Sequence, residues 1–158
     1  MADPAFATTT SEFSVKDPNE FENQLSQLGF SEEKSGGWGP WYKRTGTDLF
    51  QLFAYDDFSS MCVDFEAIGH EHAQWWARQF TRHPCGELDT WEWIKTCLPE
   101  GEHVGVVGIY NEKLTDVGGW ATLITPKSIT TMSVYDLFRE NNIDAAHKGR
   151  LKTVEIEP

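Results

Sequence analysis

The chain has 158 residues, a formal net charge of −12 at pH 7, seven tryptophans and 13% aromatic residues. This length suits one domain, and the aromatic content argues against intrinsic disorder, because disordered chains are poor in aromatic residues. The negative charge argues against direct binding of nucleic acid or of an anionic membrane, since both are negatively charged. We therefore expect a folded protein that contacts neither of them directly.

The cysteines and the apolar segments bear on where the protein works. Cys62, Cys85 and Cys97 are odd in number and show no CxxC spacing, which argues against a disulfide framework. Residues 1–10 lack the basic and apolar regions of a signal peptide. No segment reaches the ~18 consecutive apolar residues of a membrane span. We expect a protein of the reduced cytoplasm.

The N-terminal residues 1–10 are small and polar and include three consecutive threonines. Because they offer no periodic apolar contacts, we expect a disordered leader there. A single domain is then expected over residues 11–158, beginning with a short strand at residues 12–15.

A helix is the clearest element of the first half. Asp17 can cap its N-terminus, Pro18 suits the first turn, and Gly29 suits the position just after its end. Apolar residues between these signals recur at the spacing of one helix face, and they are Phe21, Leu25 and Leu28.

Strands are predicted in the middle of the chain. Residues 41–44 and 49–55 flank a short polar connection, which indicates a hairpin. Apolar and acidic residues alternate over residues 61–67, as in a strand with one buried face. We expect these three strands to be adjacent and antiparallel.

The second half is predicted to begin with two helices, over residues 70–82 and 87–98. Two apolar strands follow, over residues 103–110 and 117–125. A short helix should then begin at Ser133 and face inward with Val134, Leu137 and Phe138, and a last strand is expected over residues 151–156. This order predicts an α+β fold, a single compact domain with a mainly antiparallel sheet and three to four helices.

A metal site is one interpretation of a polar cluster in the middle of the chain. Asp64 and Glu66 fall on one face of the predicted strand, and His70 and His72 lie where it passes into a helix. Carboxylates and imidazoles are ligands of divalent metals. The spacing matches no standard zinc signature, so the plainer interpretation is a solvated strand face with no metal and no cofactor.

The acidic stretch is the other feature that points to function. Residues 46–77 contain no lysine or arginine, and the six acids there are Asp48, Asp56, Asp57, Asp64, Glu66 and Glu71. Such a field attracts basic surfaces. Trp38 lies in a glycine-rich turn, and tryptophan is a common anchor of protein interfaces. We expect Asp56, Asp57, Asp64, Glu66, Glu71 and Trp38 to form a partner-binding surface.

These observations favour a small acidic interaction protein, not an enzyme, that binds and inhibits a basic partner. By analogy, the partner would be a nucleic-acid-handling protein and this chain a phage or plasmid anti-defence inhibitor, a nucleic-acid mimic, or an immunity protein that neutralises a nuclease. One alternative is a metal-dependent hydrolase centred on Asp64, Glu66, His70 and His72. Another is a structural or assembly subunit.

Overall fold

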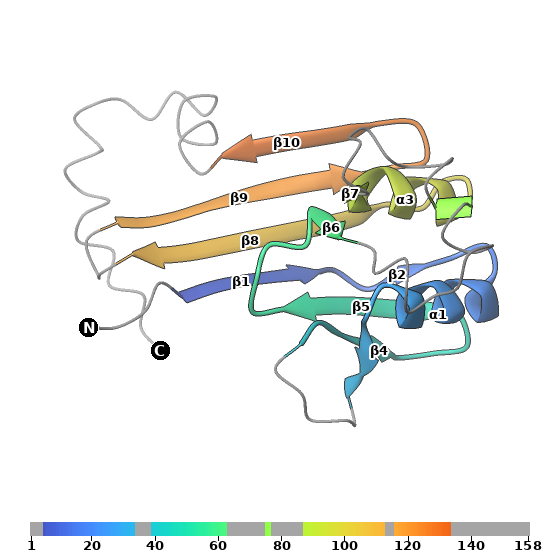
Figure 1. Cartoon of the computed structure of the whole chain (residues 1–158). Coiled ribbons are helices and arrows are strands. Elements are labelled where there is room, and N and C mark those ends of the chain that lie inside the picture. Colours follow the sequence, from blue (N-terminus) through green and yellow to red (C-terminus); the bar gives the residue numbers. More distant parts are fainter. Residues whose placement is uncertain (1–4, 34–38, 63–74, 77–86, 113–115, 134–158) are drawn as a thin grey trace.

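The computed structural model describes residues 5–33, 39–62, 75–76, 87–112 and 116–133. An eight-stranded sheet dominates it (Figure 1). Its strands are β1 (Ala5–Thr10), β2 (Phe13–Ser14), β3 (Ser31–Glu32), β4 (Trp41–Arg44), β5 (Leu49–Ala54), β8 (Val104–Glu112), β9 (Asp116–Ile124) and β10 (Ile129–Ser133). The order across the sheet is β10-β9-β8-β1-β5-β4-β3, with β2 also paired to β5. Among the described strands, only β3 and β4 pair in parallel.

Two helices and a small sheet complete the described part. The helices are α1 (Pro18–Gln27) and α3 (Thr90–Cys97), and a two-stranded sheet pairs β6 (Ser60–Cys62) with β7 (Glu87–Asp89). The predicted α+β class and the mainly antiparallel sheet are confirmed. The described residues contain two helices, fewer than the three to four expected. Apart from Trp75 and Trp76, the helix expected over residues 70–82 lies outside the described residues, as do the expected final helix and final strand.

The predicted disordered leader is wrong for every residue of it that is described. Residues 5–10 form β1, which lies between β5 and β8 and pairs antiparallel with both. Thr8, for example, lies opposite Ala54 on one side and Gly108 on the other. A chain beginning at Ser11 would lack the strand that joins the two halves of the sheet.

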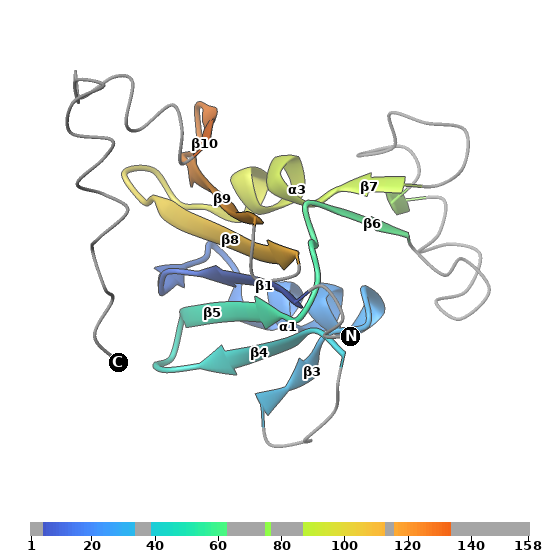
Figure 2. The same ribbon diagram turned by 90° about the vertical axis from the view of Figure 1, so that its left-hand side faces the viewer.

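The sheet has two different faces because strand side chains alternate. Both helices lie on one side, which we call the helix face, and the opposite side is called the open face (Figure 2). On the helix face, Leu52 of β5 and Val106 of β8 are fully buried. On the open face, their neighbours Phe53 and Val107 are at least partly exposed. The hydrophobic core therefore fills the space between the sheet and the helices.

Aromatic side chains dominate this core. Trp93 of α3 stacks on Phe21 of α1, with ring centroids 5.0 Å apart. Trp91, about 200° around the same helix, contacts Phe58 and Trp120. Because both tryptophans are buried, α3 is packed on two sides.

The apolar face expected on the first helix is confirmed, because Phe21, Leu25 and Leu28 are all buried. Trp76, Trp91 and Ile94 are buried in the same core. Polar partners accompany the indoles. The Nε1 of Trp93 donates to Oε1 of Gln24, and the Nε1 of Trp76 donates to Oε1 of Gln27, both at 2.8 Å. Buried indole N–H groups are thereby satisfied.

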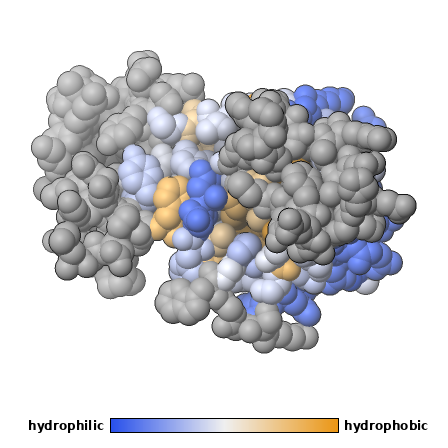
Figure 3. All heavy atoms as spheres, viewed as in Figure 1, coloured by the Kyte–Doolittle hydropathy of each residue, from blue (hydrophilic) through white to orange (hydrophobic). Residues whose placement is uncertain are grey.

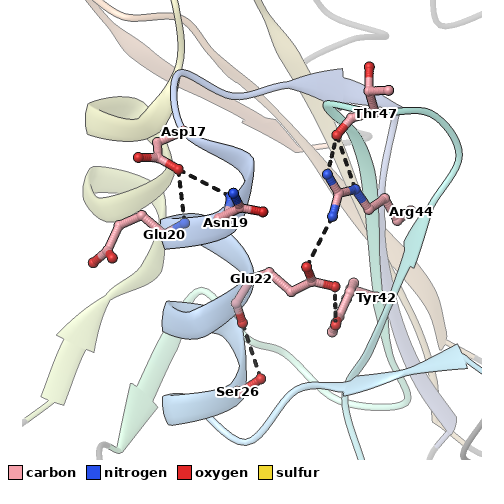
Figure 4. A network of polar contacts seen from close by, with 8 residues as sticks. All are labelled: Asp17, Asn19, Glu20, Glu22, Ser26, Tyr42, Arg44 and Thr47. Carbon is pink, nitrogen blue, oxygen red and sulfur yellow. Dashed lines mark hydrogen bonds and ion pairs between the residues drawn. The ribbon is translucent and has the colours of Figure 1, made fainter.

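The predicted start of α1 is confirmed in atomic detail. Oδ1 of Asp17 accepts hydrogen bonds from the backbone N–H groups of Asn19 and Glu20, at 3.1 and 3.0 Å (Figure 4). Pro18 is the first helical residue, and Gly29 has a φ of +83°, a conformation that favours glycine. The local signals thus fixed both ends of the helix to within two residues.

Two other expectations are corrected. The hairpin of β4 and β5 is confirmed, but β6 does not join it as a third strand and pairs instead with β7. Residues 87–89, expected to open a helix, form β7, and α3 begins only at Thr90, where Asp89 caps it by accepting from the N–H of Glu92. Pairing with β6 therefore replaces the first turn of the predicted helix.

Thr8 offers a matched test of the central place of β1. We expect Thr8→Pro to lower the free energy of unfolding by at least about 3 kcal/mol, because proline removes a ladder hydrogen bond inside a sheet. Thr8→Val should leave stability unchanged or raise it by about 1 kcal/mol, because the buried Oγ1 of Thr8 has no hydrogen-bond partner. Denaturant unfolding followed by circular dichroism measures both. Equal stability of the two variants would contradict the assigned position of β1.

Candidate interaction surface

The residues expected to bind a partner fall into two groups. Asp56 and Asp57 are described, whereas Trp38, Asp64, Glu66 and Glu71 lie outside the described residues. His70 and His72, the remaining ligands of the alternative metal site, also lie outside them. Within the described ranges no group of three or more His, Cys, Asp and Glu side chains could hold a metal ion. The site that can be built from the structure therefore starts at Asp56 and Asp57.

The two aspartates form a fixed acidic turn at the end of β5. Oδ1 of Asp56 accepts from the backbone N–H of Asp57, and Oδ1 of Asp57 accepts from that of Ser59, both at 2.8 Å. Aspartate commonly stabilises turns in this way. Both side chains are exposed, and no basic side chain of the described residues forms an ion pair with either. The turn thus presents two negative charges at a defined position.

An aromatic row leads up to this turn. The side chain of Tyr55 is 62% exposed and packs edge-on against Phe53, with centroids 4.9 Å apart. Phe53 in turn stacks on Trp41 of β4 at 4.8 Å. Trp41, Phe53 and Tyr55 form what we call the aromatic row. It ends at Tyr55, the residue before Asp56, so the aromatic row and the acidic turn are adjacent along the chain.

Sequence reasoning missed the aromatic row and chose Trp38 as the anchor. The sequence did contain a usable signal, which is the two-residue alternation of the predicted strand. The structure shows that Leu52 and Ala54 occupy its buried side, on the helix face. The alternation of a strand then places Phe53 on the open face, and Tyr55 follows in the same sense. The pairing of Trp41 with Phe53 is not readable from the sequence, because it depends on the register between β4 and β5.

A polar network on the helix face holds β4 in place (Figure 4). The hydroxyl of Tyr42 donates to Oε1 of Glu22 at 2.8 Å, and Nη1 of Arg44 donates to Oε2 of the same carboxylate at 3.1 Å. The Nε and Nη2 of Arg44 both donate to the backbone carbonyl of Thr47, which closes the turn between β4 and β5. Because Tyr42 is fixed on the helix face, Trp41 faces the other side, where it stacks on Phe53.

This network shifts the acidity of Tyr42. Burial, reinforced by the hydrogen bond to Glu22, raises the pKa of Tyr42 to about 12. The phenol therefore stays protonated and keeps donating to Glu22 throughout the physiological range. The hydrogen bond between α1 and β4 is a permanent contact at neutral pH.

Nucleophilic chemistry is not favoured by Cys97, the one cysteine whose side chain is described. Cys97 lines a hollow of about 330 Å³ between the start of α1 and the end of α3, together with Lys16 and Gln24. Burial raises the pKa of the Cys97 thiol to about 11. The thiolate, which is the reactive form, is therefore scarce at neutral pH.

Comparison with known proteins leaves the site to be interpreted from its own chemistry. No protein-family model, no curated protein and no solved structure matches the chain. None of the helices in the described ranges is long and apolar enough to cross a membrane. The aromatic row and the acidic turn together suit a cation, because a carboxylate pairs with it and an aromatic face attracts it.

The Tyr42–Glu22 contact should show a characteristic pH dependence. We expect Tyr42→Phe to lower the free energy of unfolding by about 1.5–3 kcal/mol at pH 7, since a hydrogen bond to a charged group is lost. The folded-state pKa of Tyr42 is raised above its usual 10, so its stabilising effect is complete below pH 10 and is lost as the pH rises towards 12.

Denaturant unfolding of both proteins at pH 7, 9, 10 and 11 measures this difference. The gap between wild type and Tyr42→Phe should narrow only above pH 10. A gap that is constant over the whole series would contradict the raised pKa.

Proposed function

We propose that this protein is an acidic interaction module that binds and inhibits a basic, nucleic-acid-handling protein. The observation that carries the proposal is the contiguity of the acidic turn with the aromatic row. Two exposed carboxylates without a described ion-pair partner lie next to a tyrosine that is 62% exposed. The net charge of −12 means that the molecule as a whole also attracts basic partners.

Recognition would use a lysine or arginine of the partner. The cation would pair with Asp56 or Asp57 while its alkyl stem or guanidinium packs against Tyr55. Carboxylates would then occupy positions that a phosphate backbone takes on the partner, and binding would block access of nucleic acid. An anti-defence inhibitor and a nuclease immunity protein both work in this manner, and both would act in the cytoplasm.

Rigidity of the surface supports this use. The turn is fixed by its own hydrogen bonds, and the strand before it contributes Leu52 and Ala54 to the core. A site on rigid elements loses little conformational entropy on binding. The hydrolase alternative keeps only its sequence support, because its four residues lie outside the described part of the chain.

Charge reversal tests the proposal. Immobilised wild-type protein and the variant Asp56→Lys with Asp57→Lys would be exposed to native cell lysate at 0.1 M and 1 M salt, and captured proteins identified and then purified. We expect wild type to capture a basic nucleic-acid-binding protein at low salt, because the Debye length falls from ~10 Å to ~3 Å over this range. The variant should associate with the purified partner about tenfold more slowly, since electrostatic steering is weakened.

A matched control separates local from overall charge. Glu12→Lys with Glu100→Lys changes the net charge equally, and both residues are exposed. They precede β2 and β8 at the end of the sheet away from Asp56, as the register of β1 with β5 and β8 shows. The control should bind almost as wild type does. If both double variants lose affinity equally, or if salt has no effect, the acidic turn is not the binding surface.

A further inference from the structure

The open face carries a row of side chains across the sheet that are apolar except for Thr9. Residues opposite one another in successive strands are, in order from β10 to β4, Met132, Ala121, Val107, Thr9, Phe53 and Trp41. Residues opposite one another in a sheet share a face. Ile109 and Leu123 lie on the same face beside this row, and they are 53% and 48% exposed. The β8–β10 side of the open face is therefore an exposed apolar surface.

Acidic residues are absent from the described strand positions of the open face, although the chain has 25 of them. Seen from the helix side, by contrast, strongly hydrophilic residues gather over the end of the sheet near α1 (Figure 3). An apolar face without acids on a protein this acidic is suited to being covered.

We propose that the C-terminal segment, residues 134–158, packs on the β8–β10 side of the open face. The described structure ends at Ser133, the last residue of the edge strand β10, and Met132 before it belongs to the apolar row. The segment that follows has 25 residues. A helix of ten residues is about 15 Å long, enough to cross three strands spaced ~4.8 Å apart.

The sequence of this segment fits the surface. Val134, Leu137 and Phe138 recur at the i, i+3, i+4 spacing of one helix face, while Asp136, Arg139 and Glu140 would face solvent. The apolar stripe begins directly after β10, so little chain is needed to reach Leu123 and Val107. Covalent attachment gives the segment a high effective concentration at this face.

A second copy of the chain is a poorer occupant. Two molecules that each carry a charge of −12 repel one another, and the cost rises as the salt concentration falls. The C-terminal segment has no such disadvantage, because its positive and negative side chains nearly balance, with four lysines and arginines against five aspartates and glutamates.

A double-mutant cycle in the full-length protein tests the contact. Leu123→Ser and Phe138→Ser should each lower the thermal midpoint by about 3–6 °C, and the double variant should lose clearly less than the sum. Arg139→Ser is the control, because it lies beside Phe138 on the opposite side of the predicted helix. It should show no coupling to Leu123.

Methyl-labelled NMR spectra of the wild type provide a second measurement that does not depend on variants. We expect nuclear Overhauser contacts from the methyl groups of Val107 and Leu123 to those of Val134 or Leu137, unchanged on tenfold dilution. Contacts that vanish on dilution together with a doubled mass in sedimentation would overturn the proposal in favour of a dimer. Full additivity in the cycle with no such contacts would overturn it as well.

Discussion

The insertion of β1 between β5 and β8 is the constraint on which the rest of the sheet depends. The strands β3, β4 and β5 form one group, and β8, β9 and β10 form a second. Among the described strands only β1 bonds to both groups. Residues 5–10 reach residues 106–111 to make this junction. Such a long-range pairing adds a large loop-closure cost, so the junction is expected to form late in folding.

Because side chains alternate along each strand, one face of the sheet forms the core and the other is left for the surface. Leu52, Ala54 and Val106 fill the helix face, where α1 and α3 complete the core. The intervening residues, including Phe53 and Val107, are left for the open face. The core therefore also fixes the positions of the aromatic row and the acidic turn, because β5 contributes residues to the core and leads directly into both. In β4, the hydrogen bonds from Tyr42 and Arg44 to Glu22 hold these two side chains on the helix face in the same way.

The sequence predicted those helices and strands that are marked by neighbouring residues, such as helix caps and apolar runs. Asp17 and Gly29 marked α1, and apolar runs marked β8 and β9. β1 was missed because its threonines suggest polarity, whereas Thr8 and Thr10 are buried and their burial depends on pairing partners distant in sequence. The threonines of β10 also suggest polarity, and there Thr130 and Thr131 are indeed exposed. Threonine is nevertheless a strand-forming residue, which was the signal available. Of the candidate site, the acidic turn was predictable from composition, while the row beside it required the register of β4 with β5.

Native-state hydrogen exchange tests the central position of β1 most directly. Amides in the middle of a sheet exchange only when the whole protein unfolds, whereas those of a frayed terminus exchange through local opening. We expect the slowest amides of residues 6–10, like those of β5 and β8, to have an opening free energy equal to the global free energy of unfolding. Exchange of all these amides through an opening far below the global value would contradict it, and residues 5–10 would then be a peripheral strand.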